Sequence, residues 1–235
     1  MSLSQPKKTG NPAKKFIEYG SEKGFHYYDK NTSSNVTLRK RGDKKGIYII
    51  VLDELSTITG WNEGSSSGIF SNEVHSTNEE VLDVKSFKGG RIIKGLYGDI
   101  KGDLQGGKYA KSVYAALVTG TGEDDIELVN LKLSGSGLTS WIDAKNVING
   151  DMLELAINPT EQTKGATKYY IPEIINHGAR PDILENCKSM DVELQAFLEG
   201  NTLENRETSD EKAIEKARND EYVPEAKTES EPPPF

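Results

Sequence analysis

The sequence predicts an all-β domain, mainly antiparallel, of the OB-like five-stranded barrel type with extra strands and one or two short helices. Two observations lead to this class. Short segments rich in β-branched and aromatic residues recur between residues 24 and 175, and glycine-rich turns separate them. The chain also lacks the alternation of strand and helix patterns that a doubly wound nucleotide-binding fold requires.

The strand candidates differ in how they are buried. In 35–41, apolar Val36 and Leu38 alternate with polar residues, which is the period of a half-buried strand. The run 47–52 is continuously apolar and β-branched, as expected of a central strand. We expect Pro159 and Pro172 to limit the last two strands, and 60–68 to be a flexible loop that contains Trp61. The candidates in order are 24–28, 35–41, 47–52, 81–87, 91–97, 108–118, 126–133, 152–157 and 167–175.

The sequence divides into three parts. Residues 1–20 are predicted to be a mobile basic N-terminal arm, and 21–188 to be the β-domain, with a short helix at 136–144. Residues 189–235 are predicted to contain a short helix at 190–198 and then a disordered acidic tail. From 199 to the end there are 11 Asp and Glu against 5 Lys and Arg, with few residues able to build a core.

The charge of the chain is divided unevenly along its length. Residues 1–115 contain 18 Lys and Arg against 13 Asp and Glu, whereas 116–235 contain 11 against 24, and the whole chain has a net charge of -8. A basic first half followed by an acidic second half is typical of a polyanion-binding surface with an acidic extension. The overall pI of about 5.1 therefore does not exclude nucleic acid as a partner.

The sequence also bears on the cellular compartment. Cys187 is the only cysteine, so no intramolecular disulfide forms, and this agrees with a reducing cytoplasm. No apolar run approaches the roughly 18 residues needed to cross a bilayer. The first residues include lysines but no apolar stretch of a secretory signal. We therefore expect no membrane partner.

Basic and aromatic residues are mixed in the first half of the chain. Binding of a single strand without base readout requires cations along the phosphates and flat rings on which bases stack. Tyr109 and Lys111 share one face of the 108–118 strand, and Trp61 is expected in a loop of the kind that contacts nucleic acid in OB-folds. The candidate DNA-binding residues are Tyr28, Arg39, Arg41, Lys44, Lys45, Trp61, Lys85, Lys88, Arg91, Lys94, Lys108, Tyr109 and Lys111.

Evidence for catalysis is weak in the sequence. The histidines His26, His75 and His177 are scattered and form no metal-ligand spacing with the single cysteine. Two acidic pairs, Asp99 with Asp103 and Asp124 with Asp125, fall in glycine-rich turns, where aspartate is expected for backbone reasons. The glycines before Lys108 lack the phosphate-loop pattern and precede a strand. We expect no enzyme activity, no cofactor and no metal, and a metal-dependent nuclease is the third-ranked hypothesis.

The last residues of the chain are its most specific feature. The acidic tail ends Pro232-Pro233-Pro234-Phe235 after Glu229 and Glu231, and such a peptide is a good ligand. Its terminal ring fills an apolar pocket while the α-carboxylate pairs with a basic side chain. Together with the glycine-punctuated β-pattern and the lysine-rich first half, this tail resembles the single-stranded DNA-binding proteins of tailed phages. The segments 107–111 and 128–136 are similar to proteins of this type as well.

The resemblance implies an OB-fold core and largely sequence-independent coating of single-stranded DNA in phage replication and recombination. It also implies a cytoplasmic location in the bacterial host. The six tail residues named above would recruit a polymerase, helicase or primase, and the acids would compete with DNA for the basic groove. A homodimer and binding of RNA are compatible with the sequence. The alternative is a phage structural or assembly protein, whose β-domain binds another protein and no nucleic acid.

Overall fold

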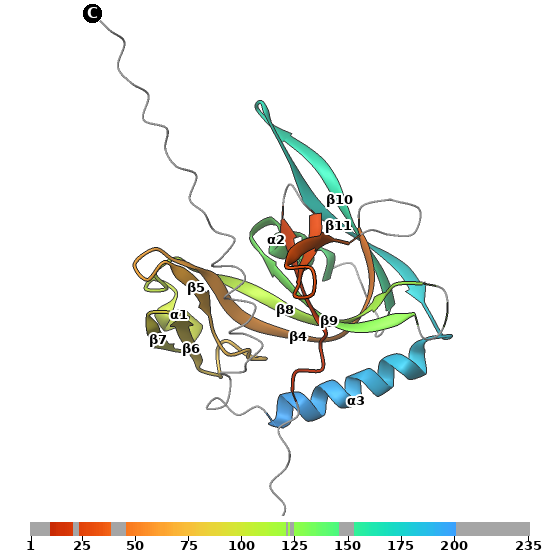
Figure 1. Ribbon diagram of the computed structural model, residues 1–235, viewed down its shortest axis with the longest axis horizontal. Helices are drawn as coiled ribbons and strands as arrows, with labels where there is room; N and C mark the ends of the chain where they lie inside the picture. Colours follow the sequence, from red (N-terminus) through yellow and green to blue (C-terminus); the bar gives the residue numbers. More distant parts are fainter. Residues whose placement is uncertain are drawn as a thin grey trace, which may run out of the picture.

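A computed structural model describes residues 10–20, 24–38, 46–120, 122, 125–145 and 153–200 of the chain (Figure 1). The described part is mostly strand, and its strands belong to one sheet. The neighbours in this sheet run β3-β2-β1-β9-β8-β4-β5-β6-β7, and β10 branches from β4 and pairs with β11. The pairing of β1 with β9 is parallel, whereas the other described pairings are antiparallel, so the sheet is mixed and not closed.

The elements have the following bounds. The strands are β1 (Lys15–Gly20), β2 (Gly24–Asp29), β3 (Ser34–Thr37), β4 (Ile47–Asn62), β5 (Ser67–Phe70), β6 (Leu82–Ser86), β7 (Gly90–Gly95), β8 (Gly107–Val118), β9 (Ile126–Ser134), β10 (Leu153–Lys164) and β11 (Thr167–Ala179). The helices are α1 (Tyr97–Ile100), α2 (Gly135–Lys145) and α3 (Leu184–Gly200).

Two apolar cores lie along the long strands β4 and β8. The first half of β4 packs in the main core, where Ile49, Val113 and Leu131 are fully buried. The second half enters a smaller core built from Ile58, Ile69 and residues of β6 and α1. We call the unit around this smaller core, made of the end of β4, β5 to β7, α1 and the start of β8, the side lobe. It extends to the left of Figure 1.

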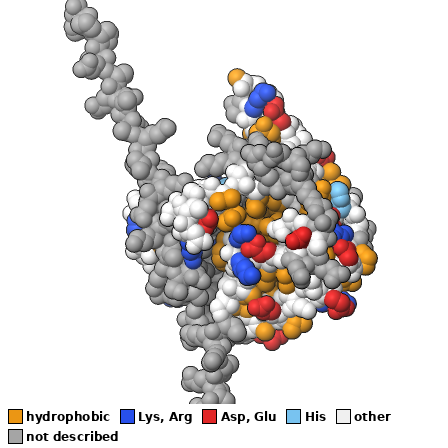
Figure 2. Space-filling model, turned by 45° about the vertical axis from the view of Figure 1, so that its right-hand side comes forward, with side chains coloured by type: hydrophobic (Ala, Val, Ile, Leu, Met, Phe, Trp, Pro, Cys, Tyr) orange, Lys and Arg blue, Asp and Glu red, His pale blue; other side chains and the backbone are white. Residues whose placement is uncertain are grey.

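The helices α2 and α3 cover opposite faces of the sheet (Figure 1). α2 inserts Trp141 into the main core. α3 packs Leu194 and Phe197 against the other face, on Leu55 of β4 and Tyr114 of β8. The hairpin of β10 and β11 stands out from the rest of the molecule (Figures 1 and 2).

The structure confirms the mainly β class and most of the strand candidates. β2, β6, β8, β9 and α2 lie within a few residues of their predicted ranges. β3 ends at Thr37, short of the predicted residue 41, since Leu38 already lies outside the strand, and residues 39–45 lie outside the described part.

The predicted loop at 60–68 is wrong at both ends, since 60–62 belong to β4 and 67–68 to β5. β4 continues through Gly60 to Asn62, and Trp61 pairs with Gly68 of β5. The glycine does not end the strand here, because it allows close approach of another backbone. A Cβ on Gly60 would lie 2.4 Å from the carbonyl oxygen of Gly106. Trp61 is therefore a strand residue held in a fixed orientation.

The prolines do not end their strands either. Pro159 and Pro172 are register partners inside the long hairpin of β10 and β11. Pro159 lies beyond Ile157, the last β10 residue that pairs with β4. Within the described sheet β11 pairs only with β10, so it is an edge strand, where proline is tolerated.

The two ends of the described chain also differ from the prediction. Residues 1–9 lie outside the described part, but the rest of the predicted arm includes β1. Ile17 of β1 is fully buried in the main core, because parallel pairing with β9 covers it. α3 begins at Leu184 and not at residue 190, since Ile183 and Cys187 already contact the sheet at Ile50. None of the described helices is long and apolar enough to cross a membrane.

Candidate nucleic-acid interface

The side lobe has one apolar face and one basic and aromatic face. Register partners and residues two apart along a strand share a face of a sheet. Thr59 pairs with Lys108 and with Phe70, and Phe70 pairs with Lys85. Leu82 and Val84 point the other way, into the lobe core. The face opposite this core contains Trp61, Phe70, Lys85, Phe87, Arg91, Lys94 and Lys108, and we call it the basic-aromatic face.

The charge of this face is positive. Its one carboxylate, Asp83, accepts two hydrogen bonds from Arg91, at 2.7 and 2.9 Å, and lies 3.5 Å from the Nζ of Lys85. The Arg91 guanidinium holds the pKa of Asp83 below its ordinary value. Lys94, the register partner of Asp83, and Lys108 are exposed. Four cations thus face one carboxylate, and an excess of positive charge remains for phosphates.

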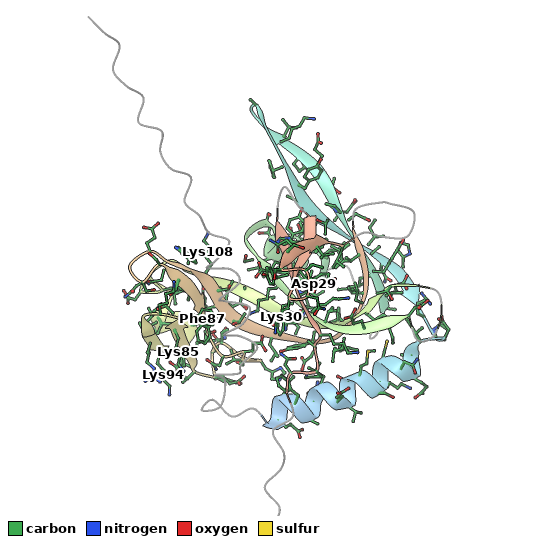
Figure 3. All side chains as sticks on the ribbon, viewed as in Figure 1. Asp29, Lys30, Lys85, Phe87, Lys94 and Lys108 are labelled. Atoms are coloured by element: carbon green, nitrogen blue, oxygen red, sulfur yellow. The ribbon has the colours of Figure 1, made fainter. Side chains whose placement is uncertain are left out.

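The rings on this face are half-buried. The rings of Phe70 and Phe87 lie 4.3 Å apart at an interplanar angle of 31°. Trp61 extends the same row, two residues beyond Thr59 on β4. Figure 3 shows Lys85, Phe87, Lys94 and Lys108 together on the side lobe. The arrangement combines flat rings with cations, the combination that binds single strands without base readout.

Two predicted DNA contacts, Tyr109 and Lys111, lie on the opposite face of β8 from Lys108. They share a face, as the sequence predicts, but both are engaged inside the protein. The hydroxyl groups of Tyr109 and Ser56 lie 2.8 Å apart, and Lys111 forms an ion pair of 2.8 Å with Glu54. With the side chain of Lys111 only 19% exposed, we assign these residues to the interior and remove them from the interface.

Glu54 is the centre of a polar cluster between the two cores. Besides Lys111, it accepts hydrogen bonds of 2.8 Å from Lys145 and from the Nε1 of Trp141. Burial alone raises the pKa of this carboxyl, but the three donors outweigh it, so the pKa lies below its usual value. Burial lowers the pKa of Lys111, and the pairing with Glu54 outweighs this and raises it. Both side chains are therefore charged at neutral pH.

The structure separates the remaining predicted residues. Tyr28 lies on β2, where it lines a cleft away from the side lobe. Lys88 is exposed in the turn between β6 and β7. Figure 3 shows Asp29 and Lys30, the neighbours of Tyr28, in the middle of the molecule. The predicted residues Arg39, Arg41, Lys44 and Lys45, and the tail residues Glu229, Glu231, Pro232, Pro233, Pro234 and Phe235, lie outside the described part.

The list of candidate residues drawn from the sequence missed two rings of the basic-aromatic face, Phe70 and Phe87. The signal for Phe87 is its spacing of two residues from Lys85 in the predicted strand 81–87. In the structure β6 ends at Ser86, and Phe87 begins the turn with its ring beside that of Phe70. Phe70 has no such signal, because only the pairing of β5 with β6 brings it beside Lys85.

In the described ranges, no three His, Cys, Asp or Glu side chains are grouped so as to hold a metal ion. No protein-family model matches the sequence, and comparison with curated proteins and with solved structures gave no significant match. The interface therefore has to be judged on its own chemistry.

Proposed function

We propose that this protein binds single-stranded DNA without catalysis and largely without sequence preference, through the basic-aromatic face of the side lobe. The observation that supports this most directly is the composition of that face. Lys85, Arg91, Lys94 and Lys108 surround Trp61, Phe70 and Phe87 on the side opposite the lobe core. Cations along phosphates and rings under bases are the two requirements for such binding.

The connectivity of the strands supports an OB-like barrel as the scaffold. In an OB-fold, strands 1 to 3 form an antiparallel meander, strand 4 pairs with strands 1 and 5, and a helix commonly joins strands 3 and 4. β4, β8, β9, α2, β10 and β11 follow this order, and β4 pairs with both β8 and β10. The fold departs at closure, since β9 pairs in parallel with β1 and not with β11.

This assignment gives the side lobe a functional position. In OB-folds the loop between strands 1 and 2 flanks the surface that binds oligonucleotides. Here the connection from β4 to β8 is that loop, and it has grown into β5, β6, β7 and α1. The long hairpin of β10 and β11 corresponds to the loop between strands 4 and 5, the other flank. The basic-aromatic face thus lies on an element that binds nucleic acid in this class of fold.

The acidic tail is proposed to compete with DNA and to recruit replication proteins of the host or phage. Residues 201–235, which contain the acids and the terminal Pro-Pro-Pro-Phe, follow directly after α3. α3 packs on Leu55 of β4, and Thr59 and Trp61 lie on the same face of that strand. The chain therefore leaves α3 on the side of the sheet that presents the cations, and tethering at this point raises the effective concentration of the acidic residues around them.

The test is fluorescence anisotropy of a labelled oligo-dT of about 30 nucleotides, longer than one OB-fold footprint, titrated at several salt concentrations. In this assay each lost phosphate contact reduces the slope of log K against log salt by about 0.7. We expect the triple variant Lys85→Gln, Lys94→Gln and Lys108→Gln to reduce it by about 2. Lys101→Gln is the matched control, since Lys101 is exposed at the end of α1, on the core side of the same lobe.

The outcomes separate the hypotheses. A slope reduced in the triple variant and not in the control supports the basic-aromatic face, and tighter binding after truncation behind Gly200 supports tail competition. Absence of binding by both the full and the truncated chain at low salt would refute DNA binding. A protein-binding module of phage assembly would then be the better explanation.

A further inference from the structure

A second cleft lies outside the side lobe, on the outer face of β1, β2 and β3. Its volume is about 610 Å³, within the range of small-ligand sites. The residues before β1 and the turn after β2 form its walls. Its lining includes Lys14, Phe16, Tyr28, Lys30 and Asn35. Of these, only Tyr28 is singled out by the sequence.

The strand register aligns rings in this cleft. Ile17 pairs with Tyr27, so Phe16 and Tyr28 come to the same level on the opposite face of β1 and β2. Tyr28 in turn pairs with Asn35 of β3. Ile17 is fully buried in the main core, whereas Phe16 and Tyr28 are half-buried and line the open cleft. Two rings and an amide thus form a row across three strands.

Charges of both signs lie around this row. Glu18, two residues from Phe16 on the same face of β1, also lines the cleft. Lys15 points to the other face of β1, where it forms an ion pair of 2.5 Å with Glu127 and lies 5.0 Å from the ring centroid of Tyr27. The carboxylate of Asp29 closes its own turn by accepting hydrogen bonds from the residues that follow it. Lys14 and Lys30 are exposed at the rim.

We propose that this cleft holds one nucleotide of the bound single strand, with its base on Phe16 and Tyr28 and its phosphates beside Lys14 and Lys30. A base has an aromatic face that fits the rings, and a side-chain amide such as that of Asn35 is of the chemical kind that complements the polar edge of a base. Stacking of bases on rings of an open sheet face is an established mode of nucleic-acid binding. This inference rests on the proposed function and adds a second contact point to it.

The cleft and the basic-aromatic face lie on the same side of the sheet. Phe16 pairs with Asn130 of β9, and Asn130 pairs with Tyr114 of β8. Tyr114 lies on the same face of the sheet as Leu55 and Thr59 of β4. α3 packs on Tyr114 and Leu55, on strands between the two surfaces. Because α3 covers the strands between them, a DNA strand that contacts both surfaces has to be long enough to pass over or around this helix, whereas a short oligonucleotide engages one of them.

The first experiment measures the affinity of the full-length protein for long and short oligo-dT with ring variants. Phe16→Ala and Tyr28→Ala are each expected to weaken binding of the long strand about 5- to 150-fold, the equivalent of about 1–3 kcal/mol per stacked base. Tyr28→Phe retains the ring and should bind like the unmodified protein. Tyr97→Ala removes a half-buried ring of α1 on the core side of the side lobe and is the matched control.

The second experiment locates the base directly and does not depend on variant stability. Oligo-dT with 5-iododeoxyuridine is cross-linked by light to the unmodified protein, and the attached residues are identified by mass spectrometry. Cross-links at Phe16 or Tyr28 support the cleft, and Lys14→Glu with Lys30→Glu should abolish them. Cross-links confined to Trp61, Phe70 and Phe87, with unchanged affinity of the ring variants, would overturn this inference and leave the proposed function intact. Absence of DNA binding by the unmodified protein would refute both.

Discussion

Replacement of Glu54 by glutamine removes the charge at the centre of the polar cluster and keeps its volume. The carboxylate is 14% exposed and has three donors at 2.8 Å. In the variant Trp141 keeps an acceptor and Lys145, which is 57% exposed, regains water. Lys111 loses its ionic partner and retains neutral ones, including the hydroxyl of Ser56 at 3.2 Å. Removing one partner of a buried ion pair costs about 3–5 kcal/mol, and partial exposure of Lys111 reduces this to about 2–3 kcal/mol.

The assay is urea denaturation followed by tryptophan fluorescence, combined with a thermal melt. For a domain of this size the expected loss corresponds to a fall in Tm of about 4–12 °C. Glu79→Gln is the control, because Glu79 is exposed in a turn and its replacement should change stability by less than about 0.5 kcal/mol. A Glu54→Gln protein that unfolds at the same urea concentration as the control would refute the reasoning that the cluster joins α2 to the sheet.

Four further predictions concern the titration of Glu54, the two lysines of β8, the ring of Trp61 and the backbone at Gly106. The folded-state pKa of Glu54 lies below the unfolded value of 4.5. The stability that the ionised carboxylate contributes is therefore complete above pH 4.5 and is lost as the pH falls through the folded-state pKa. Stability measured below pH 4.5 should therefore fall less steeply in Glu54→Gln. Lys111→Gln should lower the midpoint of urea denaturation and leave the salt dependence of DNA binding unchanged. Lys108→Gln should do the reverse: it should reduce the slope of log K against log salt by about 0.7 without loss of stability. Trp61→Ala should weaken DNA binding by about 1–3 kcal/mol in anisotropy titrations, and an unchanged affinity would remove this ring from the interface. Gly106→Ala should destabilise the protein by at least about 1–3 kcal/mol in urea, because its φ is +100° and a Cβ would lie 2.2 Å from the carbonyl oxygen of Trp61.

The sequence predicts the elements that have a local signal and misses those whose burial depends on distant partners. The strand-like run 108–118 between glycine-rich turns and the apolar run from Ile47 place β8 and the start of β4 correctly, because the signal lies in their own residues. β1 was missed because lysines precede it and only its pairing with β9 buries Ile17. Gly60 was interpreted as a loop residue because close approach of Gly106 is a tertiary fact with no local signature.

The candidate site could likewise be predicted from the sequence only in part. Charge composition located the basic half of the chain, and Lys85, Arg91, Lys94 and Lys108 do come together on one face. The sequence does not reveal that a lysine is paired inside the protein. Lys111 lies on the opposite face of β8 from Lys108, and its partner there, Glu54, comes from another strand. The polar character of residues 1–15 hid Lys14, and with it the flank of the second cleft.

β4 runs without interruption from the main core into the side lobe, and this has a consequence for the thermodynamics of binding. The strand is 16 residues long and pairs with β8 over most of its length. Backbone amides on both sides of Glu54 should therefore exchange with solvent through the same global opening and not through separate local ones. A lobe tied in this way presents its cations and rings already ordered, so little conformational entropy is lost on association. Release of a ligand then requires no refolding of the lobe, and the dissociation rate is set by the contacts alone.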